Sequence, residues 1–466
     1  MPTTDKPLPL TIAILAAGLG TRMKSRRAKV LHEAGGRPLV EHVVATALTL
    51  APPERIYVIV GHQAEEVQAA IGATGVRFVH QAEQRGTGHA LMAGREAMAG
   101  LDGLLLVLYG DIPLISAATL RALTDRQRAS DAAGTILTGM LPDPTGYGRV
   151  VRHGDGSVAA IVEQKAASPE HLAIREANMG IYCWRADLFW EHIGEIQPNN
   201  PVKEYYLTDM VEILLQAGYG MEAMVVGDVR EALGINNRIE LAEVDRILRE
   251  AKARQLMLDG VTIQKPETVS IDADVSIGMD TVVEPFAQIL GRTTVGANCR
   301  IGACSVVRDS ELADGAEVGP FTVVAASKLE SACRVGPFAR LRPGNSVGRG
   351  AQVGNFVELK KTRLGEGSKA NHLAYLGDAE IGRRTNIGAG AITCNYDGVR
   401  KHATHIADGV FVGSNATLVA PLEVGEGAYI GAGSVVTEEV PPDALALGRA
   451  RQVVKEGWAK NGPRKD

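Results

Sequence analysis

The C-terminal half of the chain, from about Val261 onward, carries a repeat of six residues that limits the possible folds more than any other feature. In each repeat an aliphatic residue is followed by a small one, and several repeats lie six residues apart, as Ile381-Gly382 and Ile387-Gly388 do. Hexapeptide periodicity is typical of a parallel β-helix, in which each hexad forms one short strand with its aliphatic residue pointing to the axis. One coil cannot bury its own apolar face, so the coils stack. We predict a left-handed parallel β-helix over residues 260–466.

The repeat breaks once, and the break predicts a loop. The rhythm stops after Thr393 and resumes at Ile406, so that Cys394–His405 does not fit the pattern. Loops on a rigid scaffold often carry function. We therefore expect functional residues in this segment.

The N-terminal half alternates predicted strands with predicted helices. This order favours a Rossmann-like, mostly parallel sheet with helices on both faces, over residues 1–238. Ligands of such sheets bind at the carboxyl ends of the strands. Apolar residues at near-helical spacing then predict a linker helix over residues 239–259. The predicted strands are Thr11–Ala16, Arg55–Val60, Val76–His80 and Leu104–Tyr109, and the predicted helices include Val40–Leu50, Ala64–Ile71 and His89–Ala99.

Composition excludes some classes of function. The 466 residues carry a net charge of -5, and no run of one sign is long enough to form a basic stripe. General binding of nucleic acid or of a membrane surface is therefore not expected. The apolar run Ile12–Ala17 is too short to span a bilayer. We expect no stable membrane insertion, no signal peptide and a cytoplasmic location.

A glycine-rich turn follows the first predicted strand. Gly18 and Gly20 would let backbone N–H groups approach phosphate oxygens, and a helix beginning there would add its dipole. Arg22 and Lys29 supply positive charge close by. The turn is neither a Walker A loop nor a complete GxGxxG motif, and many such turns are glycine-rich for packing alone.

Two further segments strengthen the interpretation as a phosphate site. The stretch from Gln81 to Ala90 again has a strand, a glycine turn and the start of a helix, and Asp111 follows the apolar strand that ends at Tyr109. A lone aspartate in such a place is usually a turn or cap residue. Next to phosphates it becomes a candidate Mg²⁺ ligand, because Mg²⁺ takes one or two carboxylates together with substrate oxygens.

In the C-terminal half, one histidine is a candidate general base. Arg342, Glu358 and Lys360 place charges on the predicted coils, although each by itself is consistent with a solvated surface. His372 lies between this basic cluster and the loop that contains Asn395. A lone histidine is more often structural, but a protonated amine cannot attack a thioester, and an imidazole can take its proton near neutral pH.

These motifs carry a resemblance to known enzymes. The run from Leu15 to His32 resembles the signature of nucleotide-sugar pyrophosphorylases. The whole chain resembles a bacterial family of bifunctional N-acetylglucosamine-1-phosphate uridyltransferases and glucosamine-1-phosphate N-acetyltransferases. The resemblance implies acetylation of glucosamine 1-phosphate by acetyl-CoA. Transfer of UMP from UTP to N-acetylglucosamine 1-phosphate would follow and give UDP-N-acetylglucosamine for cell-wall (peptidoglycan) synthesis. It also implies Mg²⁺ as cofactor and a homotrimer with acetylation sites between neighbours.

For the N-terminal half the resemblance implies a nucleotide site, a metal site and a sugar site. Two positions depart from the family, Ala28 where proline is usual and Met179 where threonine is commoner. The implied residues are Leu15, Ala16, Ala17 and Gly18 around the nucleotide, Arg22 and Lys29 as catalytic cations on its phosphates, Gln81, Gly86 and Thr87 at the uracil, Tyr109 beside the substrate, Asp111 and Asn236 on Mg²⁺, and Gly148, Glu163, Asn178, Tyr206 and Thr208 at the N-acetylated sugar.

For the C-terminal half the resemblance implies a sugar-phosphate site next to a site for acetyl-CoA. His372 would be the catalytic base, and Glu358 would orient the base or the amine. Asn371 departs from the glycine that the family commonly has. The other implied residues are Arg342, Lys360, Tyr375 and Asn386 at the sugar phosphate, and Ala389, Asn395, Tyr396, Ser414, Ala432 and Arg449 at acetyl-CoA.

Two other hypotheses remain open on the residues alone. A single-function pyrophosphorylase could carry the β-helix as a regulatory or oligomerising cap. A regulatory scaffold with decayed sites would have no activity at all. His372, Lys360 and the loop at Cys394–His405 argue against the first hypothesis. The charged groups at Lys29, Asp111 and His372 argue against the second, because a decayed site should have lost at least one of them.

Overall fold

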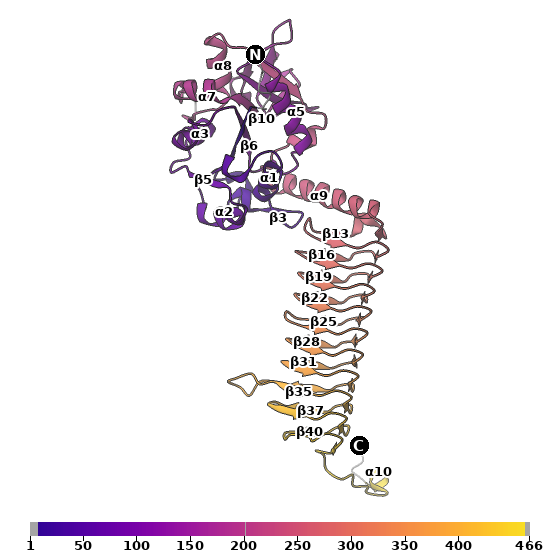
Figure 1. Cartoon of the computed structure of the whole chain (residues 1–466). Helices are drawn as coiled ribbons and strands as arrows, with labels where there is room; N and C mark the ends of the chain where they lie inside the picture. Colours follow the sequence, from indigo (N-terminus) through magenta and orange to yellow (C-terminus); the bar gives the residue numbers. More distant parts are fainter. Residues whose placement is uncertain (1–7, 201, 462–466) are drawn as a thin grey trace, which may run out of the picture. The chain divides into compact units, whose positions relative to one another are not determined.

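Figure 1 shows the computed structural model of the chain, which describes residues 8–200 and 202–461. The chain forms two compact units that divide between Leu248 and Arg249.

A nine-stranded sheet forms the centre of the first unit. Its main path runs β11-β7-β10-β6-β1-β4-β5, with all neighbours parallel except β10, which is antiparallel to β6 and β7. The sheet is mostly parallel, as predicted. Its strands are β1 (Leu10–Ala16), β4 (Ile56–Val60), β5 (Arg77–His80), β6 (Leu104–Tyr109), β7 (Gly134–Met140), β10 (Glu176–Arg185), β11 (Met221–Val225) and the hairpin β8 (Arg149–Arg152) and β9 (Val158–Val162).

Helices cover both faces of this sheet. Both faces are apolar, because successive residues of each buried strand point to opposite sides. In β1, Ile12 and Ile14 join one apolar cluster, whereas Ala13 and Leu15 join the other. The first cluster includes α1 (Leu39–Leu48), α2 (Ala64–Ile71) and α5 (Ala117–Arg128), and the second includes α3 (Thr87–Ala93), α7 (Ala186–His192) and α8 (Asp209–Gln216). The short helices α4 (Arg95–Met98) and α6 (Pro169–Leu172) complete the unit.

The prediction of one helix over His89–Ala99 was wrong. The structure has two helices, α3 and α4, separated at Gly94. The first also begins two residues earlier than predicted, after Gly86, whose φ of 110° suits glycine. The other predicted strands and helices begin and end within two residues of the bounds in the structure.

The long helix α9 (Arg238–Leu258) confirms the predicted linker helix. Val244 in its first half packs with Met23, Leu39 and Ile235 in the first unit. Ala253 and Leu256, which belong to the second unit, join the apolar core of the first coils of the β-helix.

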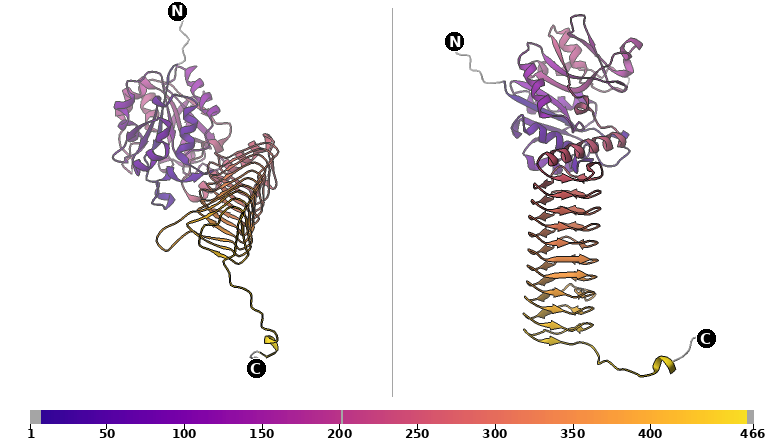
Figure 2. Two further views of the ribbon diagram at one scale, coloured as in Figure 1. Left: turned by 60° about the horizontal axis from the view of Figure 1, so that its bottom comes forward. Right: turned by 90° about the vertical axis from the view of Figure 1, so that its right-hand side faces the viewer.

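The second unit is a left-handed parallel β-helix of three sheets, with 11, 10 and 9 short strands. Val283 pairs with Ile301 and Ile301 with Val318, so one coil takes 17 or 18 residues. Figure 2 shows the coils stacked one on another, with a triangular cross-section. The aliphatic residue of each strand points inward, and one continuous cluster runs from Ala253 to Val440. The predicted architecture is confirmed.

The residues predicted for acetyl transfer lie on or beside the coils from β25 (Arg340–Leu341) onward. The strands run from β12 (Thr262–Ile263) to β41 (Leu445–Ala446), and those used below are β25 (Arg340–Leu341), β27 (Gln352–Asn355), β28 (Glu358–Lys360), β30 (Lys369–His372), β31 (Tyr375–Gly377), β33 (Asn386–Ile387), β34 (Ile392–Cys394), β35 (Thr404–Ile406), β36 (Phe411–Val412) and β39 (Tyr429–Ile430).

The predicted loop is present but shorter than expected. Ile387 pairs with Val412, so this coil takes 25 residues. Cys394 still belongs to β34, and Thr404 and His405 already belong to β35. The loop therefore covers Asn395–Ala403, and Figure 1 shows it projecting from the stack beside β35.

No helix of residues 8–200 and 202–461 combines the length and the apolar character that a membrane span requires.

The stacked core makes a first prediction. Leu359→Ala should lower the free energy of unfolding of the β-helix by about 2–5 kcal/mol, because Leu359 is fully buried and its neighbours are held in register by parallel pairing. Lys328→Ala, on the exposed face of a strand, should change it by less than about 0.5 kcal/mol. Chemical denaturation followed by circular dichroism would compare the two, and equal losses would contradict the axial role of Leu359.

Candidate active sites

A cleft of about 460 Å³ lies at the carboxyl ends of β1 and β6 in the first unit. Thirteen of the residues proposed for the N-terminal chemistry line it. They are Leu15, Ala16, Ala17, Gly18, Arg22, Lys29, Gln81, Gly86, Thr87, Tyr109, Asp111, Tyr206 and Asn236. The cleft also contains Leu19, Thr21, Gln84 and Glu204, which sequence reasoning did not single out.

The glycine turn differs from its prediction in one respect. After Gly20 the chain forms only a three-residue 3₁₀ turn, Thr21–Met23. So short a turn has no useful macrodipole, and the expected helix dipole is absent here. Gly20 has φ 62°, and a methyl group on it would lie 2.5 Å from Lys29 Cβ, whereas a methyl group on Gly18 would face open space. Gly20 is thus required for packing against Lys29.

The predicted cations and metal ligands converge on one place. Lys29 Nζ forms an ion pair with Asp111 and donates to Asn236 Oδ1 at 3.2 Å. Arg22 also donates to Asn236 Oδ1, at 2.8 Å. The side chains of Lys29 and Asp111 are only 15% and 17% exposed, so little water screens the pair.

The start of α9 holds Asn236 in this cluster. The backbone N–H of Asn236 donates to Glu240 Oε2 at 2.6 Å, and Asn237 Nδ2 donates to Glu240 Oε1 at 2.6 Å. Asn237 Oδ1 in turn accepts the N–H of Glu240 at 3.0 Å. This reciprocal arrangement resembles a capping box at the beginning of a helix.

The donor set fits a hard divalent cation. Among the described residues no group of three or more His, Cys, Asp or Glu side chains could hold a metal. However, the Asp111 carboxylate and the Asn236 amide oxygen already converge on a single positive charge, the Lys29 ammonium. One carboxylate and one amide oxygen, with substrate phosphates, make the oxygen-only set that Mg²⁺ prefers.

The residues proposed for the uracil hold their own loop in place through hydrogen bonds and close packing. Gln81 is buried, and its Nε2 donates to the Gly86 carbonyl at 3.3 Å. Thr87 Oγ1 accepts the N–H of Leu207 at 3.1 Å. Gly86 has no room for a side chain, because a methyl group there would lie 2.5 Å from the Tyr205 carbonyl oxygen.

Four residues proposed for the sugar do not line the cleft itself but contact one another. Thr208 Oγ1 donates to Glu163 Oε1 at 3.3 Å, and the Asn178 N–H donates to the Gly148 carbonyl at 2.8 Å. Burial raises the pKa of Glu163, and the hydrogen bond from Thr208 only partly offsets this. Burial also raises the pKa of the neighbouring Asp209, to about 6.

In the second unit, the side chains at one corner of the coil differ in size before and after His372. Backbone hydrogen bonds align equivalent corner residues of successive coils, Leu373 N–H with the Asn355 carbonyl and Gly390 N–H with the His372 carbonyl. Coils before this point present the large side chains Phe321, Phe338, Phe356 and Leu373 at the corner, and coils after it present Gly390, Asn415 and Gly433.

Three of the residues proposed for acetyl-CoA lie beside this part of the corner. Ala389 accepts the N–H of Asn415, and Ser414 accepts the N–H of Gly433, so that Ala389, Ser414 and Ala432 form one column that continues from His372. An extended ligand can approach the backbone closely along such a column. Arg449 follows the last strand, β41, and is exposed.

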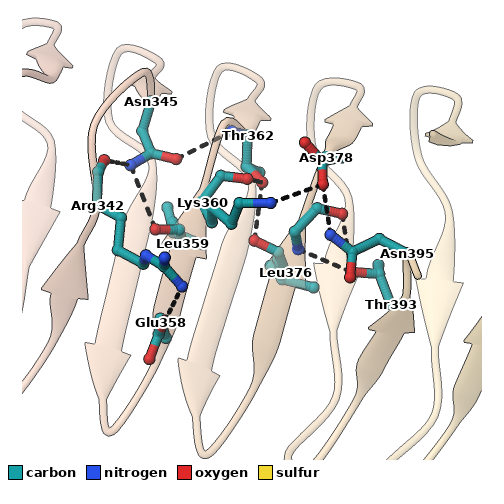
Figure 3. Close-up of polar contacts among 11 residues, drawn as sticks. Arg342, Asn345, Glu358, Leu359, Lys360, Thr362, Leu376, Asp378, Thr393 and Asn395 are labelled. Atoms are coloured by element: carbon teal, nitrogen blue, oxygen red, sulfur yellow. Dashed lines mark hydrogen bonds and ion pairs between the residues drawn. The ribbon is translucent and has the colours of Figure 1, made fainter. Parts of the chain in front are cut away.

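A polar network runs across the neighbouring face (Figure 3). Arg342 contacts Glu358 at 3.3 Å, and Lys360 Nζ contacts Asp378 Oδ2 at 3.0 Å. Asn395 at the base of the loop donates to the same carboxylate. The hydrogen bond with Asp378 raises the pKa of Lys360. Burial alone would raise the pKa of Asp378, but the hydrogen bonds from Lys360 and Asn395 outweigh it and hold the pKa below its usual value.

His372 and Tyr375 stand on either side of this corner. His372 ends β30 and is exposed, and Tyr375 begins β31 directly opposite Glu358 in the register. Asn386 lies one coil further, opposite Lys369. The proposed base, the sugar residues and the polar network therefore come from adjacent coils.

Charged groups within the projecting loop hold its shape. Asp397 Oδ1 accepts the N–H groups of Val399 and Arg400, and its Oδ2 lies 2.7 Å from His402 Nε2. These hydrogen bonds lower the pKa of Asp397 to about 2. Tyr396, which forms a bridge with Lys401, is 59% exposed at the loop surface.

Comparisons with known proteins agree with this division. Residues 12–164 match the family of MobA-like NTP transferase domains, and residues 274–309 and 403–438 match the bacterial transferase hexapeptide repeats. The bifunctional protein GlmU of Solibacter usitatus is 63% identical over 454 residues, which cover 97% of each chain. The chain belongs to the GlmU family. Its GlmU relatives in Koribacter versatilis and Trichlorobacter lovleyi are 53% and 48% identical over 96% of this chain, and cover 96% and 97% of their own lengths.

As a GlmU family member, the chain is a bifunctional enzyme. The NTP transferase match places nucleotidyl transfer in its N-terminal half, and the hexapeptide repeats place acyl transfer in its C-terminal half. Both open alternatives, a single-function pyrophosphorylase and an inactive scaffold, are thereby excluded.

Sequence reasoning missed several residues that support the GlmU sites. Asp378 joins Lys360 to Asn395, and Glu240 holds Asn236. Asp378 follows Gly377 at the end of a strand, in the same relation as Asp111 to Gly110, and that similarity could have indicated it.

The raised pKa of Glu163 makes a second prediction. Where Glu163 is charged its burial opposes folding, so Glu163→Gln should raise stability by about 0.5–1 kcal/mol at pH 7. The gain should shrink as the pH falls through the raised pKa and vanish below about 4.5, where the side chain is protonated in the folded and unfolded protein. Pyrophosphate release should fall about tenfold or more, because a charged acceptor is lost. Glu170→Gln is the exposed control, and unchanged stability at pH 7 would contradict the burial argument.

A third prediction concerns Asp378. Asp378→Asn keeps the size of the side chain but removes the charge that aligns Lys360 with Asn395. Thiol release from acetyl-CoA should fall about tenfold through a higher KM for the sugar phosphate. Glu311→Gln, exposed on another sheet, should have no effect. A lower KM would instead mean that Asp378 opposes phosphate binding.

Proposed function

We propose that the chain makes UDP-N-acetylglucosamine in two steps. It first acetylates glucosamine 1-phosphate with acetyl-CoA and then transfers UMP from UTP to N-acetylglucosamine 1-phosphate, with release of pyrophosphate. The observation that carries this proposal is the presence, in one GlmU family chain, of the Lys29, Asp111 and Asn236 cluster and of the His372 corner.

In the first unit the chemistry is positioning and charge stabilisation. A phosphate oxygen of the sugar 1-phosphate attacks the α-phosphorus of UTP in line, and pyrophosphate leaves from the opposite side. Lys29 and Arg22 lie beside the glycine turn, where they would balance the charge of the triphosphate. Asp111 and Asn236 would hold Mg²⁺, which supplies further charge neutralisation when bound.

The remaining residues of the first unit would select the two substrates. Gln81, Gly86 and Thr87 surround the proposed uracil site, and Glu163, Asn178, Tyr206 and Thr208 with Gly148 and Tyr109 surround the proposed sugar site. The carboxylate of Glu163 is suited to accept hydrogen bonds from sugar hydroxyl groups. This supports a substrate that carries free hydroxyl groups, such as a sugar.

In the second unit His372 would act as the base. As the sugar amine attacks the thioester carbonyl, the imidazole takes the amine proton, and the coenzyme A thiolate leaves once the tetrahedral intermediate collapses. Arg342 and Lys360 would bind the sugar phosphate, with Tyr375 and Asn386 at the sugar. Ala389, Ser414 and Ala432 would bind acetyl-CoA along the corner of small residues, together with Asn395 and Tyr396 of the loop and with Arg449.

We also propose a homotrimer that works in the cytoplasm. Phe321, Phe338 and Phe356 stack on one another and stay 46–59% exposed, which leaves an apolar edge that another copy of the chain would cover. UTP and acetyl-CoA are both cytoplasmic metabolites, and the product is a precursor for cell-wall synthesis. The two proposed domains are residues 1–238 and 260–466, with residues 239–259 as the linker.

The fourth prediction separates the two activities. His372→Ala should lower thiol release from acetyl-CoA and glucosamine 1-phosphate by about 10²-fold or more and leave pyrophosphate release unchanged. Asp111→Ala should do the reverse in an assay with UTP, N-acetylglucosamine 1-phosphate and Mg²⁺. Each variant serves as the folding control of the other. Loss of both activities in a variant that stays folded would contradict the assignment to two sites.

A further inference from the structure

The backbone of the residue before Lys29 forms a hydrogen bond with a side chain from another part of the first unit. Ala28 is buried, and its backbone N–H donates to Gln63 Oε1 at 2.5 Å. Gln63 lies 35 residues away, in the connection between β4 and α2. One amide oxygen therefore fixes the backbone immediately ahead of the ammonium that lies in the cleft.

The backbone around Lys29 has little stability of its own. Lys29–Leu31 form a single 3₁₀ turn, closed by the N–H groups of Leu31 and His32. A single turn fixes several dihedral angles for very few hydrogen bonds, so its position depends on external contacts. Gly20 limits the Lys29 stem from one side, and the hydrogen bond of Gln63 restrains the chain ahead of it.

Gln63 is itself well anchored. Its carbonyl accepts the first hydrogen bond of α2, from Val67, which is fully buried. Its backbone has φ 52° and ψ 45°, a left-handed conformation that is uncommon for residues other than glycine. This conformation aims the side chain from the end of a rigid helix at the turn before Lys29.

We propose that Gln63 is a positioning residue for nucleotidyl transfer, which places the Lys29 ammonium through the backbone of Ala28. The inference rests on the proposed role of Lys29 at the phosphates of UTP. Gln63 acts on the reaction only through Lys29 and touches no substrate.

The dihedral angles of Ala28 allow a second substitution that should restore the activity lost with Gln63. With φ -55° and ψ 140°, this position accepts proline, which has no N–H and fixes φ near this value. The proline ring would occupy the space where the N–H now meets Gln63. Proline therefore replaces the restraint only when residue 63 is small.

The first experiment measures kcat/KM for pyrophosphate release from UTP by the full chain. Gln63→Ala should lower it about tenfold, because the buried N–H of Ala28 loses its acceptor. Gln63→Glu keeps an oxygen acceptor and should retain most of the activity. Gln68→Ala, the same change on α2, should have no effect. Thiol release by the same preparations should stay unchanged and reports that the chain is folded.

The rescue distinguishes positioning from a general loss of structure. Ala28→Pro alone should lower kcat/KM, because its ring meets the Gln63 side chain. Ala28→Pro combined with Gln63→Ala should restore kcat/KM to within about threefold of the original value. A double variant that is worse than both single variants would overturn the proposal.

A cycle with Lys29→Ala tests the route of the effect. In that background Gln63→Ala should cause no additional loss, because the group that Gln63 positions is gone. A further tenfold loss would overturn the proposal and leave the proposed function standing. Full pyrophosphate release by Lys29→Ala would instead overturn the proposed role of Lys29 and the inference with it.

Discussion

The regular stacking of aliphatic side chains along the axis is the constraint on which the second unit depends. A coil without the projecting loop must return to the same phase after 17 or 18 residues so that residues such as Val283, Ile301 and Val318 remain in line. Parallel pairing then sets neighbouring strands about 4.8 Å apart. Polar residues on the outer face inherit this spacing. Arg342 and Lys360 come from two successive coils, at a separation that suits a small anionic substrate, and Asn395 comes from the second coil after that of Lys360. The apolar core thus determines the geometry of the polar site.

The two candidate sites share one electrostatic arrangement on unrelated scaffolds. In the first unit Lys29 contacts Asp111 and Asn236, and in the second Lys360 contacts Asp378, which also binds Asn395. Both ammonium groups are less than one-fifth exposed. A carboxylate keeps each ammonium in place before an anion arrives, so little reorganisation is required when charge develops.

Features with a strict period could be predicted from the sequence, and features made by isolated contacts could not. The repeat of an aliphatic residue followed by glycine predicted the β-helix and the position of its loop. Buried strands such as Leu104–Tyr109 were predicted with the correct first and last residues. The helix after Gly86 was predicted as one piece because Gly94 interrupts it without interrupting the apolar pattern. Contacts such as Ala28 with Gln63, which lie 35 residues apart, depend on three-dimensional placement and leave no periodic signal. Most residues proposed for the N-terminal site do meet in one cleft, because the carboxyl ends of parallel strands lie at one edge of a sheet.

The capped start of α9 has a consequence for where the chain can be divided. The break between the compact units falls after Leu248, within α9, and the carboxylate that holds the backbone of Asn236 is that of Glu240, in the first turn of the same helix, where Asn237 bonds to it. A fragment that stops at the end of the sheet, at Val225, would retain every strand of the first unit and lose the candidate metal ligand Asn236, and one that stops before Glu240 would lose the support of that ligand. We therefore expect that any fragment or gene fusion that is to retain nucleotidyl transfer without the β-helix must keep the first turns of α9.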